Sequence, residues 1–239
     1  MPRKMVTILA GVALAGLLII AAAAAYVLRT PTASSGEFTA IPVQPTSTEA
    51  EPTQQETAKS AGPIIAELVQ EESEARFIIN EILSGNPNEV VGITNDVAAQ
   101  IVVDPANPAN TQLGVVQVNA RTLATDSERR NRAIQNAILN TGQFEFITFT
   151  PTSFINFPTA GAVSDTFQFQ IVGNLTIRDI TKEVTFDVTV TIESVSRLSG
   201  LATATIRRAD FDLAIPQIPQ VASVDEEVRL ELEFVAVAQ

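Results

Sequence analysis

The strongest constraint on the fold is a strict alternation of apolar and polar residues in three stretches, 166–177, 182–192 and 228–234. In 182–192, every second residue from Val184 to Ile192 is apolar, and the residues between them are charged or threonine. Because successive side chains of a strand point to opposite faces, each stretch predicts an antiparallel strand with one face buried and the other in water. Further strands are expected near 75–83, 88–94, 97–103, 112–123, 143–149 and 199–207, with Gly-, Pro- and Asn-rich turns between several of them.

Two segments have a helical rather than an alternating pattern. The apolar spacing in 64–72 predicts a short amphipathic helix. A second helix is predicted over 126–139, since Thr125 and Glu128 form a capping-box pattern and two isoleucines then repeat at helical spacing. The fold is therefore expected to be mainly β, with eight or nine strands and one inserted helix in a barrel or a sandwich.

The N-terminus has a different character. A short basic start precedes residues 5–28, which carry no charge. As a helix, this stretch would be about 36 Å long, enough for a hydrocarbon core of about 30 Å. We therefore expect residues 1–29 to form a single-pass membrane anchor, with the C-terminal domain on the extracytoplasmic side of the cell membrane. A cleaved signal peptide is the alternative, because alanines at 21–25 suit a cleavage site, and cleavage would leave a secreted or periplasmic protein.

Residues 30–62 consist mostly of Pro, Thr, Ser, Glu and Gln. The segment has few large apolar residues and therefore buries too little surface to offset the loss of chain entropy on folding. We expect a disordered linker here. The folded domain is then expected to cover residues 63–239.

Composition excludes several classes of function. The chain has no Cys and no His, which rules out disulfides, thiolate nucleophiles, Ser-His-Asp chemistry and the usual zinc sites. Its formal net charge of −12 has the wrong sign for binding nucleic acid. We therefore expect no nucleic-acid partner, no metal, no cofactor and no enzymatic activity.

Two features are candidates for a binding site. Many of the phenylalanines fall in residues 144–157, and a barrel of about eight strands either fills with such side chains or keeps a cavity for an apolar ligand. Composition alone allows both. Arg129, Arg130 and Arg132 form a basic cluster, which would contact either a phosphate or lipid headgroup or only solvent on a helix surface.

Three motifs in the domain are specific enough to suggest a family. The charged run ERRNR at 128–132 leads to the strand QFEFITF at 143–149, and two later stretches read GNLTIRDITKEVTFDV at 173–188 and ATATIRRADFDL at 202–213. Together they resemble the YceI-like family of lipid-binding, lipocalin-like proteins. The resemblance implies an eight-stranded antiparallel β-barrel around an elongated apolar pocket that holds a polyisoprenoid or quinone-like chain. Two histidines usual in that family are missing, and Arg132 and Arg178 stand near their places.

For such a barrel, the alternation gives the side chains expected to line the pocket: Phe146, Phe167, Phe169, Ile171, Phe186, Val188 and Val190. An error of one residue in the phase of a strand would turn its side chains to the outer face. Arg129, Arg130 and Arg132 are the candidate headgroup contacts. The resulting hypothesis is a membrane-tethered extracytoplasmic protein that binds an apolar lipid inside the barrel. A packed interaction or structural domain without a ligand is the alternative, and the formation of a homodimer stays open.

Overall fold

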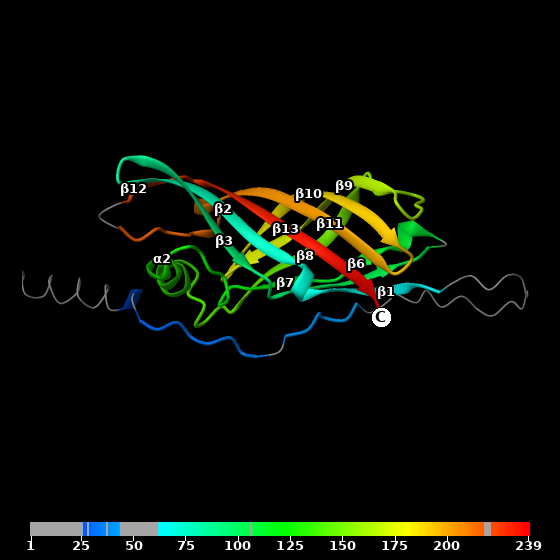
Figure 1. Cartoon of the computed structure of the whole chain (residues 1–239), viewed down its shortest axis with the longest axis horizontal. Coiled ribbons are helices and arrows are strands. Elements are labelled where there is room, and N and C mark those ends of the chain that lie inside the picture. Colours follow the sequence, from blue (N-terminus) through cyan, green and yellow to red (C-terminus); the bar gives the residue numbers. More distant parts are fainter. Residues whose placement is uncertain (1–25, 28, 37, 44–61, 106, 218–220) are drawn as a thin grey trace, which may run out of the picture.

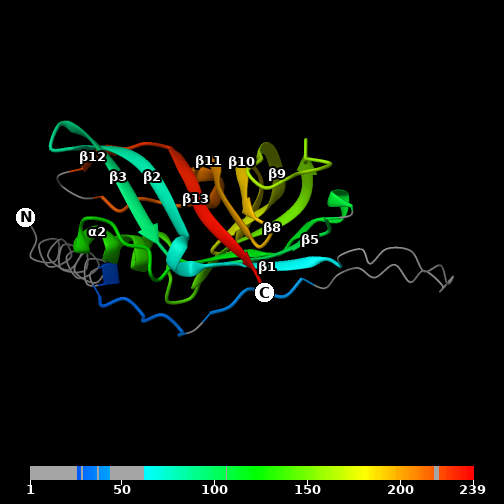
Figure 2. The same ribbon diagram turned by 45° about the vertical axis from the view of Figure 1, so that its right-hand side comes forward.

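The computed structural model of the chain describes residues 26–27, 29–36, 38–43, 62–105, 107–217 and 221–239. Most of the regular structure in these residues is one antiparallel sheet that curls strongly on itself (Figure 1, Figure 2). Its strands are β1 (Ile64–Leu68), β2 (Glu74–Leu83), β3 (Asn86–Thr94), β4 (Val97–Ala98), β5 (Gln100–Val103), β6 (Gln112–Leu113), β7 (Val116–Asn119), β8 (Phe146–Ile155), β9 (Thr166–Ile177), β10 (Ile180–Ser194), β11 (Arg197–Arg207), β12 (Val221–Val224) and β13 (Glu227–Ala238).

The curled sheet, called the shell below, has its two ends joined through the chain. Neighbouring strands follow the order β4-β7-β8-β9-β10-β11-β13-β1-β5-β6. Only Ala99, which is buried, separates β4 from β5, so strands near opposite ends of this order are continuous in sequence. The hairpin of β2 and β3 pairs with the first half of β13 and projects from one end of the shell (Figure 2).

The mainly β architecture is confirmed, but the expected count of eight strands is wrong. The described residues form thirteen strands, because long stretches of the wall bend and divide. A 3-10 turn at Gln70–Glu72 separates β1 from β2, and the stretch 86–103 divides into β3, β4 and β5.

The alternating stretches form the strands that the sequence predicts. β9 and β10 are an antiparallel hairpin in which Val188 lies opposite Phe169 and Phe186 lies opposite Ile171. The hairpin turns at Arg178, whose positive φ of 59° is the left-handed conformation that tight turns use. Residues 228–234 lie within β13, which pairs with β11 along its length and with β2 and β1 on its other edge.

Of the two helical predictions, the one over 64–72 is wrong and the one over 126–139 holds in part. Residues 64–72 form β1 and then the 3-10 turn, because β1 pairs with β13 on one edge and with β5 on the other. Those backbone bonds outweigh the local helical pattern. Within 126–139, α2 (Glu128–Ala133) is followed by a π-helical turn (Ile134–Ile138).

The start of α2 also differs from the capping-box prediction. Ser127 caps the helix, since its Oγ accepts a hydrogen bond from the backbone N–H of Arg130 at 3.4 Å. The backbone N–H and the Oγ1 of Thr125 instead each donate to Oδ1 of Asn131 at 2.7 Å. The hydroxyl group of Thr125 therefore bonds to a side chain in the middle of the helix and does not cap its first turn.

The α2 helix and its π-helical turn close one end of the shell, beneath the β2–β3 hairpin (Figure 1). Buried Ile134 and Leu139 join Leu123 and Phe211 in the apolar cluster at this end. We call it the α2 end. The opposite end contains the loop between β8 and β9 and the turn between β10 and β11 (Figure 1).

Part of the stretch 30–62, for which the sequence predicts a disordered linker, is described. Residues 30–36 and 38–43 run along the outside of the shell (Figure 1, Figure 2), and Ser35, for example, hydrogen bonds to Glu145. Residues 44–61 lie outside the described part of the chain. No helix among the described residues is long and apolar enough to cross a membrane, and of residues 5–28 only Tyr26 and Val27 are described.

Candidate lipid cavity

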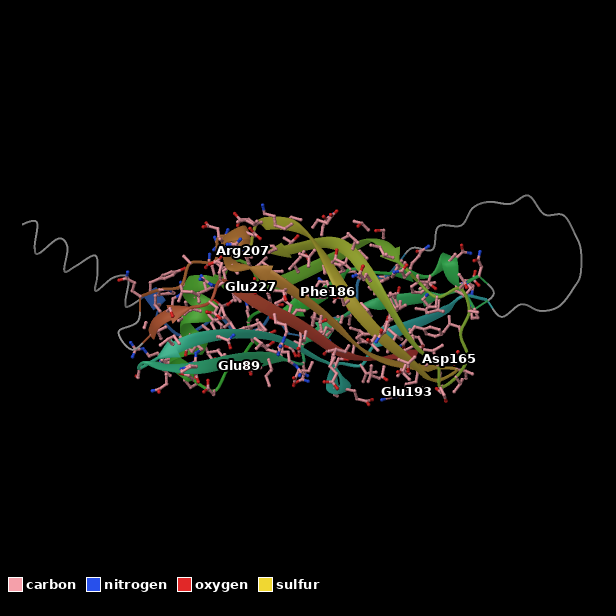
Figure 3. All side chains as sticks on the ribbon, turned by 90° about the horizontal axis from the view of Figure 1, so that it is seen from above. Glu89, Asp165, Phe186, Glu193, Arg207 and Glu227 are labelled. Atoms are coloured by element: carbon pink, nitrogen blue, oxygen red, sulfur yellow. The ribbon has the colours of Figure 1, made fainter. Side chains whose placement is uncertain are left out.

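A cavity of about 910 Å³ runs through the inside of the shell. Its wall is built from the inward faces of the strands: every second residue from Phe167 to Ile171, from Phe186 to Ile192 and from Val228 to Ala238 lines it. Figure 3 shows Phe186 midway along the shell, with Asp165 and Glu193 near the end opposite α2. The period-two pattern of the strands thus supplies a continuous apolar lining.

Six of the seven side chains expected to face the pocket line this cavity: Phe167, Phe169, Ile171, Phe186, Val188 and Val190. Phe146 does not, because the phase of β8 is shifted by one residue from the expected one. Ile147 and Phe149 face inward, and the ring of Phe146 stacks on Phe38 outside the shell, with 5.2 Å between the ring centroids.

Sequence reasoning missed five aromatic side chains of the wall: Phe77, Phe149, Phe154, Phe157 and Phe234. The ring of Phe157 lies 4.8 Å from that of Phe154 and 5.0 Å from that of Phe169, measured between centroids. A register shift between Pro151 and Ser153 changes the phase of β8, so that both Phe149 and Phe154 point inward. The density of phenylalanine in 144–157 was the available signal, but the bulge cannot be read from the alternation.

The three candidate headgroup arginines are not equivalent. Arg129 and Arg130 line the cavity at the α2 end, whereas Arg132 is exposed and does not line it. A guanidinium nitrogen of Arg130 lies 3.0 Å from Oε1 of Glu81, and a second one pairs with Asp126. Arg130 is therefore already compensated by two carboxylates.

Glu81 is the partner that fixes Arg130. Its side chain points inward from β2 with only 7% of its surface exposed, and the side-chain amide of Asn88 also donates to its Oε1, at 3.0 Å. By contrast, Arg129 is exposed and forms no ion pair with any described residue. Among the described arginines that line the cavity, Arg129 alone lacks a carboxylate partner.

At the opposite end, Arg197 lines the cavity between two glutamates. Its guanidinium lies 2.6 Å from Oε2 of Glu72 and 2.6 Å from Oε2 of Glu193. The hydrogen bond from Arg197 lowers the pKa of Glu72, and hydrogen bonds from Ser199 and Arg197 lower that of Glu193. The same two carboxylates raise the pKa of Arg197, so this end is a closed charge network.

The comparisons with known proteins agree with this architecture. The model of the YceI-like domain matches residues 67–236. The UPF0312 protein YE1254 of Yersinia enterocolitica is 27% identical over 173 residues, which cover 70% of this chain and 84% of that protein.

Two solved structures share the fold at low sequence identity. BcnA of Burkholderia cenocepacia superposes with a TM-score of 0.57 at 18% identity, covering 70% of this chain and 98% of BcnA. A polyisoprenoid binding domain from Saccharophagus degradans, implicated in plant cell wall breakdown, superposes with a TM-score of 0.58 at 12% identity, covering 74% and 99%. At such identities these likenesses show the fold alone.

Proposed function

This chain belongs to the YceI-like family, and we propose that it is a binding protein, not an enzyme, that holds the apolar chain of a polyisoprenoid or quinone-like lipid inside its shell. The observation that carries the proposal is the cavity of about 910 Å³ with its wall of apolar strand faces. This volume lies near the upper limit of the roughly 300–1,000 Å³ typical of small-molecule sites. The description of the S. degradans domain as polyisoprenoid-binding supports the ligand class.

The energetics of such binding are adequate. At about 0.8 kcal/mol per buried methylene, ten carbons contribute roughly 8 kcal/mol before the losses of ordering. That corresponds to about micromolar affinity where the ordering losses are small. Longer isoprenoid tails would bind more tightly if the cavity accommodates their additional units.

The polar end of the ligand is assigned to the α2 end of the cavity. Arg129 has no carboxylate partner in the described part of the chain, so its guanidinium is available to a hydrogen-bond acceptor. A phosphate oxygen or a quinone carbonyl fits that role. Arg130 contributes mainly through its pairing with Glu81, and Arg132 does not reach the cavity.

We also propose that residues 5–28 remain as an uncleaved membrane anchor and that the shell lies on the extracytoplasmic side. The support is the length of this uncharged stretch, which exceeds the usual apolar region of a signal peptide. The protein would then take its ligand from, or deliver it to, the membrane that holds it.

A cavity-filling substitution tests the binding proposal. Val188 lines the cavity and is 4% exposed, so Val188→Phe should place a ring in ligand space. We expect the purified variant to lose at least about tenfold in retention or uptake of a polyprenyl or quinone probe, with little loss of stability. Organic extraction followed by mass spectrometry measures retained lipid, and a native mass spectrum also reports whether the chain is a monomer or a homodimer.

Val172→Phe is the matched control, because Val172 is a half-buried valine of β9 that does not line the cavity. It should leave retention unchanged. Wild-type protein that neither carries nor takes up an apolar probe would refute the proposal. So would a Val188→Phe variant destabilised by the roughly 1–3 kcal/mol of an overpacked core with no ligand lost.

A further inference from the structure

The strap, which we define as residues 26–27, 29–36 and 38–43, is held to the shell by side chains that the lipid cavity does not use. In Figure 1 and Figure 2 it leaves the α2 end and runs beneath the shell toward the opposite end. Its partners lie on β5, on β7 and the residue pair that follows it, on the π-helical turn and just before β8.

The firmest attachment is at the beginning of the strap. Asn136, in the π-helical turn, is 3% exposed, and its side-chain amide donates to the carbonyl oxygens of Val27 at 3.0 Å and Arg29 at 2.8 Å. Its Oδ1 accepts from Nε of Arg29 at 3.4 Å, and the hydroxyl of Tyr26 donates to Oδ1 of Asn140 at 3.2 Å. Every described hydrogen bond of the Asn136 side chain thus goes to the strap. Without these partners, a buried side-chain amide would lower the stability of the folded shell.

The middle of the strap is bound by a second polar group. The backbone N–H and the Oγ of Ser35 both donate to Oε1 of Glu145 at 2.8 Å. Arg121 donates to the carbonyl of Ala33 at 3.1 Å and pairs with Glu145 at 2.7 Å. The side-chain amide of buried Asn119 donates to Oγ of Ser34 at 2.8 Å.

The last part of the strap is fixed near the opposite end. Phe38 stacks on Phe146, and the backbone N–H of Val43 donates to Oε1 of Gln100 at 2.7 Å. Gln100 is 8% exposed and lies within β5. The contacts therefore hold the strap along its whole described length.

These contacts leave no slack between the uncharged stretch 5–28 and the α2 end. Val27, next to the last residue of that stretch, is bonded directly to Asn136. On the basis of the membrane anchor proposed above, we propose that the strap holds the α2 end of the shell against the bilayer from which residues 5–28 emerge. The linker expected from the sequence would instead leave the domain free to move away from the membrane.

The charges at the α2 end suit this orientation. The chain as a whole is acidic, but Arg29, Arg129 and Arg132 are all exposed here, and none pairs with a carboxylate in the described residues. Exposed acids lie at this end too, namely Glu128 in α2 and Asp210 and Asp212 on either side of Phe211, while Asp126 is already paired with Arg130. Exposed arginines next to a membrane are attracted to anionic lipid headgroups, and a tyrosine such as Tyr26 favours the interface.

The cavity also reaches the surface at this end. Ser84, at the tip of the β2–β3 hairpin, and Arg129 both line the cavity and are exposed. An amphiphile could therefore pass between the bilayer and the cavity at the α2 end with its apolar chain shielded from water.

The absence of cysteine makes the orientation directly measurable. Single cysteines are introduced in the full-length chain at Glu128, exposed in α2, and at Val195, which is 83% exposed in the turn between β10 and β11. Each is labelled with a fluorophore, and the chain is reconstituted into phosphatidylglycerol-containing vesicles whose headgroups carry a nitroxide quencher. We expect several-fold stronger quenching at position 128 than at position 195.

Two variants test whether the strap sets this orientation. A flexible Gly/Ser insertion between residues 25 and 26, ahead of the first contacts of the strap with Asn140 and Asn136, leaves the shell and the strap contacts untouched and adds slack, so the difference in quenching should collapse. Asn136→Leu removes the attachment at the start of the strap and should do the same, whereas Asn174→Leu, on an exposed asparagine of β9, should not.

The outcomes separate this inference from the proposal on which it rests. If the chain does not float with the vesicles, the membrane anchor is wrong and the orientation falls with it. If the chain floats but both positions are quenched equally, or position 195 more strongly, the anchor stands and the orientation is wrong. A difference that survives the insertion would mean that the strap does not set it. Lipid retention, measured by extraction, tests the cavity independently of all three.

Discussion

Arg130 both lines the cavity and stabilises the shell. It lines the cavity from α2, and its guanidinium bridges Glu81 of β2 and Asp126. Because Glu81 is almost fully buried, its carboxylate relies on Arg130 and on Asn88 to replace the water it has lost. The ion pair therefore ties the projecting hairpin to the helix that closes the shell.

This pairing predicts unequal effects for two arginines of the same helix. Arg130→Gln should lower the free energy of unfolding by about 1–3 kcal/mol, because it leaves a buried carboxylate without its cation. Arg132→Gln, at an exposed position with no described ion pair, should change it by less than about 0.5 kcal/mol. Urea unfolding of both variants measures the difference. Equal and small effects would show that Glu81 is hydrated and does not depend on Arg130.

At the scale of elements, the strap is bound by a carboxylate that titrates. Burial raises the pKa of Glu145, but hydrogen bonds from the backbone and hydroxyl of Ser35 and the charge of Arg121 outweigh it, so the pKa lies below its ordinary value of 4.5. The docked strap thus favours the ionised carboxylate. By linkage, its contribution to docking is complete above the ordinary value and is lost as the pH falls through the lowered one.

The expected result is a strap that loosens in acid. The amide of Ser35, which donates to Glu145, should be protected from hydrogen exchange at neutral pH and lose protection as the pH falls below about 4.5, relative to an undocked peptide of the same sequence. Exchange measured by mass spectrometry reports this. Glu145→Gln should show the weakened protection already at neutral pH, and an unchanged profile in that variant would contradict the assignment.

The elements also show what alternation can and cannot predict. Alternation predicted β9 and β10 correctly. It also identified the strand face, with Phe186 and Val188, that lines the cavity, because both strands are regular over many residues. It failed for β8, where the bulge at Pro151 shifts the phase and Phe146 packs outside against the strap. Such a contact depends on a segment distant in sequence, so no local pattern contains it.

Gly173 shows a packing contact that the sequence suggests, and the strap shows contacts that the sequence does not reveal. A glycine within a strand suggests close packing, and a Cβ atom at Gly173 would lie 2.5 Å from the ring of Phe149, which covers it. The strap has no apolar periodicity, and its composition is that of a disordered segment. Its order comes from polar side chains of the shell that meet its backbone, which composition does not reveal.

At the scale of the whole molecule, the ends of the shell differ in charge organisation. At one end Arg197 is paired with two glutamates, a group whose net charge is −1, whereas the α2 end has exposed arginines without carboxylate partners in the described part of the chain. In a protein of net charge −12, these arginines are the groups of the α2 end that an anionic surface would attract. The strap also starts from the α2 end, so the chain connection to residues 5–28 and these arginines lie at the same end of the shell.

Whether the shell is held at a membrane depends on the N-terminal stretch. If residues 5–28 span the bilayer, membranes should retain the full chain after high-salt and carbonate washes, and protease added to spheroplasts should release a fragment that begins within 30–62. A soluble mature chain that begins near residue 26 would establish signal cleavage instead. Such a chain would keep the strap and its contacts with Asn136, so it should still fold and bind lipid while losing retention by the membrane. Fractionation combined with the mass of the mature N-terminus therefore separates the anchored carrier from a secreted one without altering the cavity.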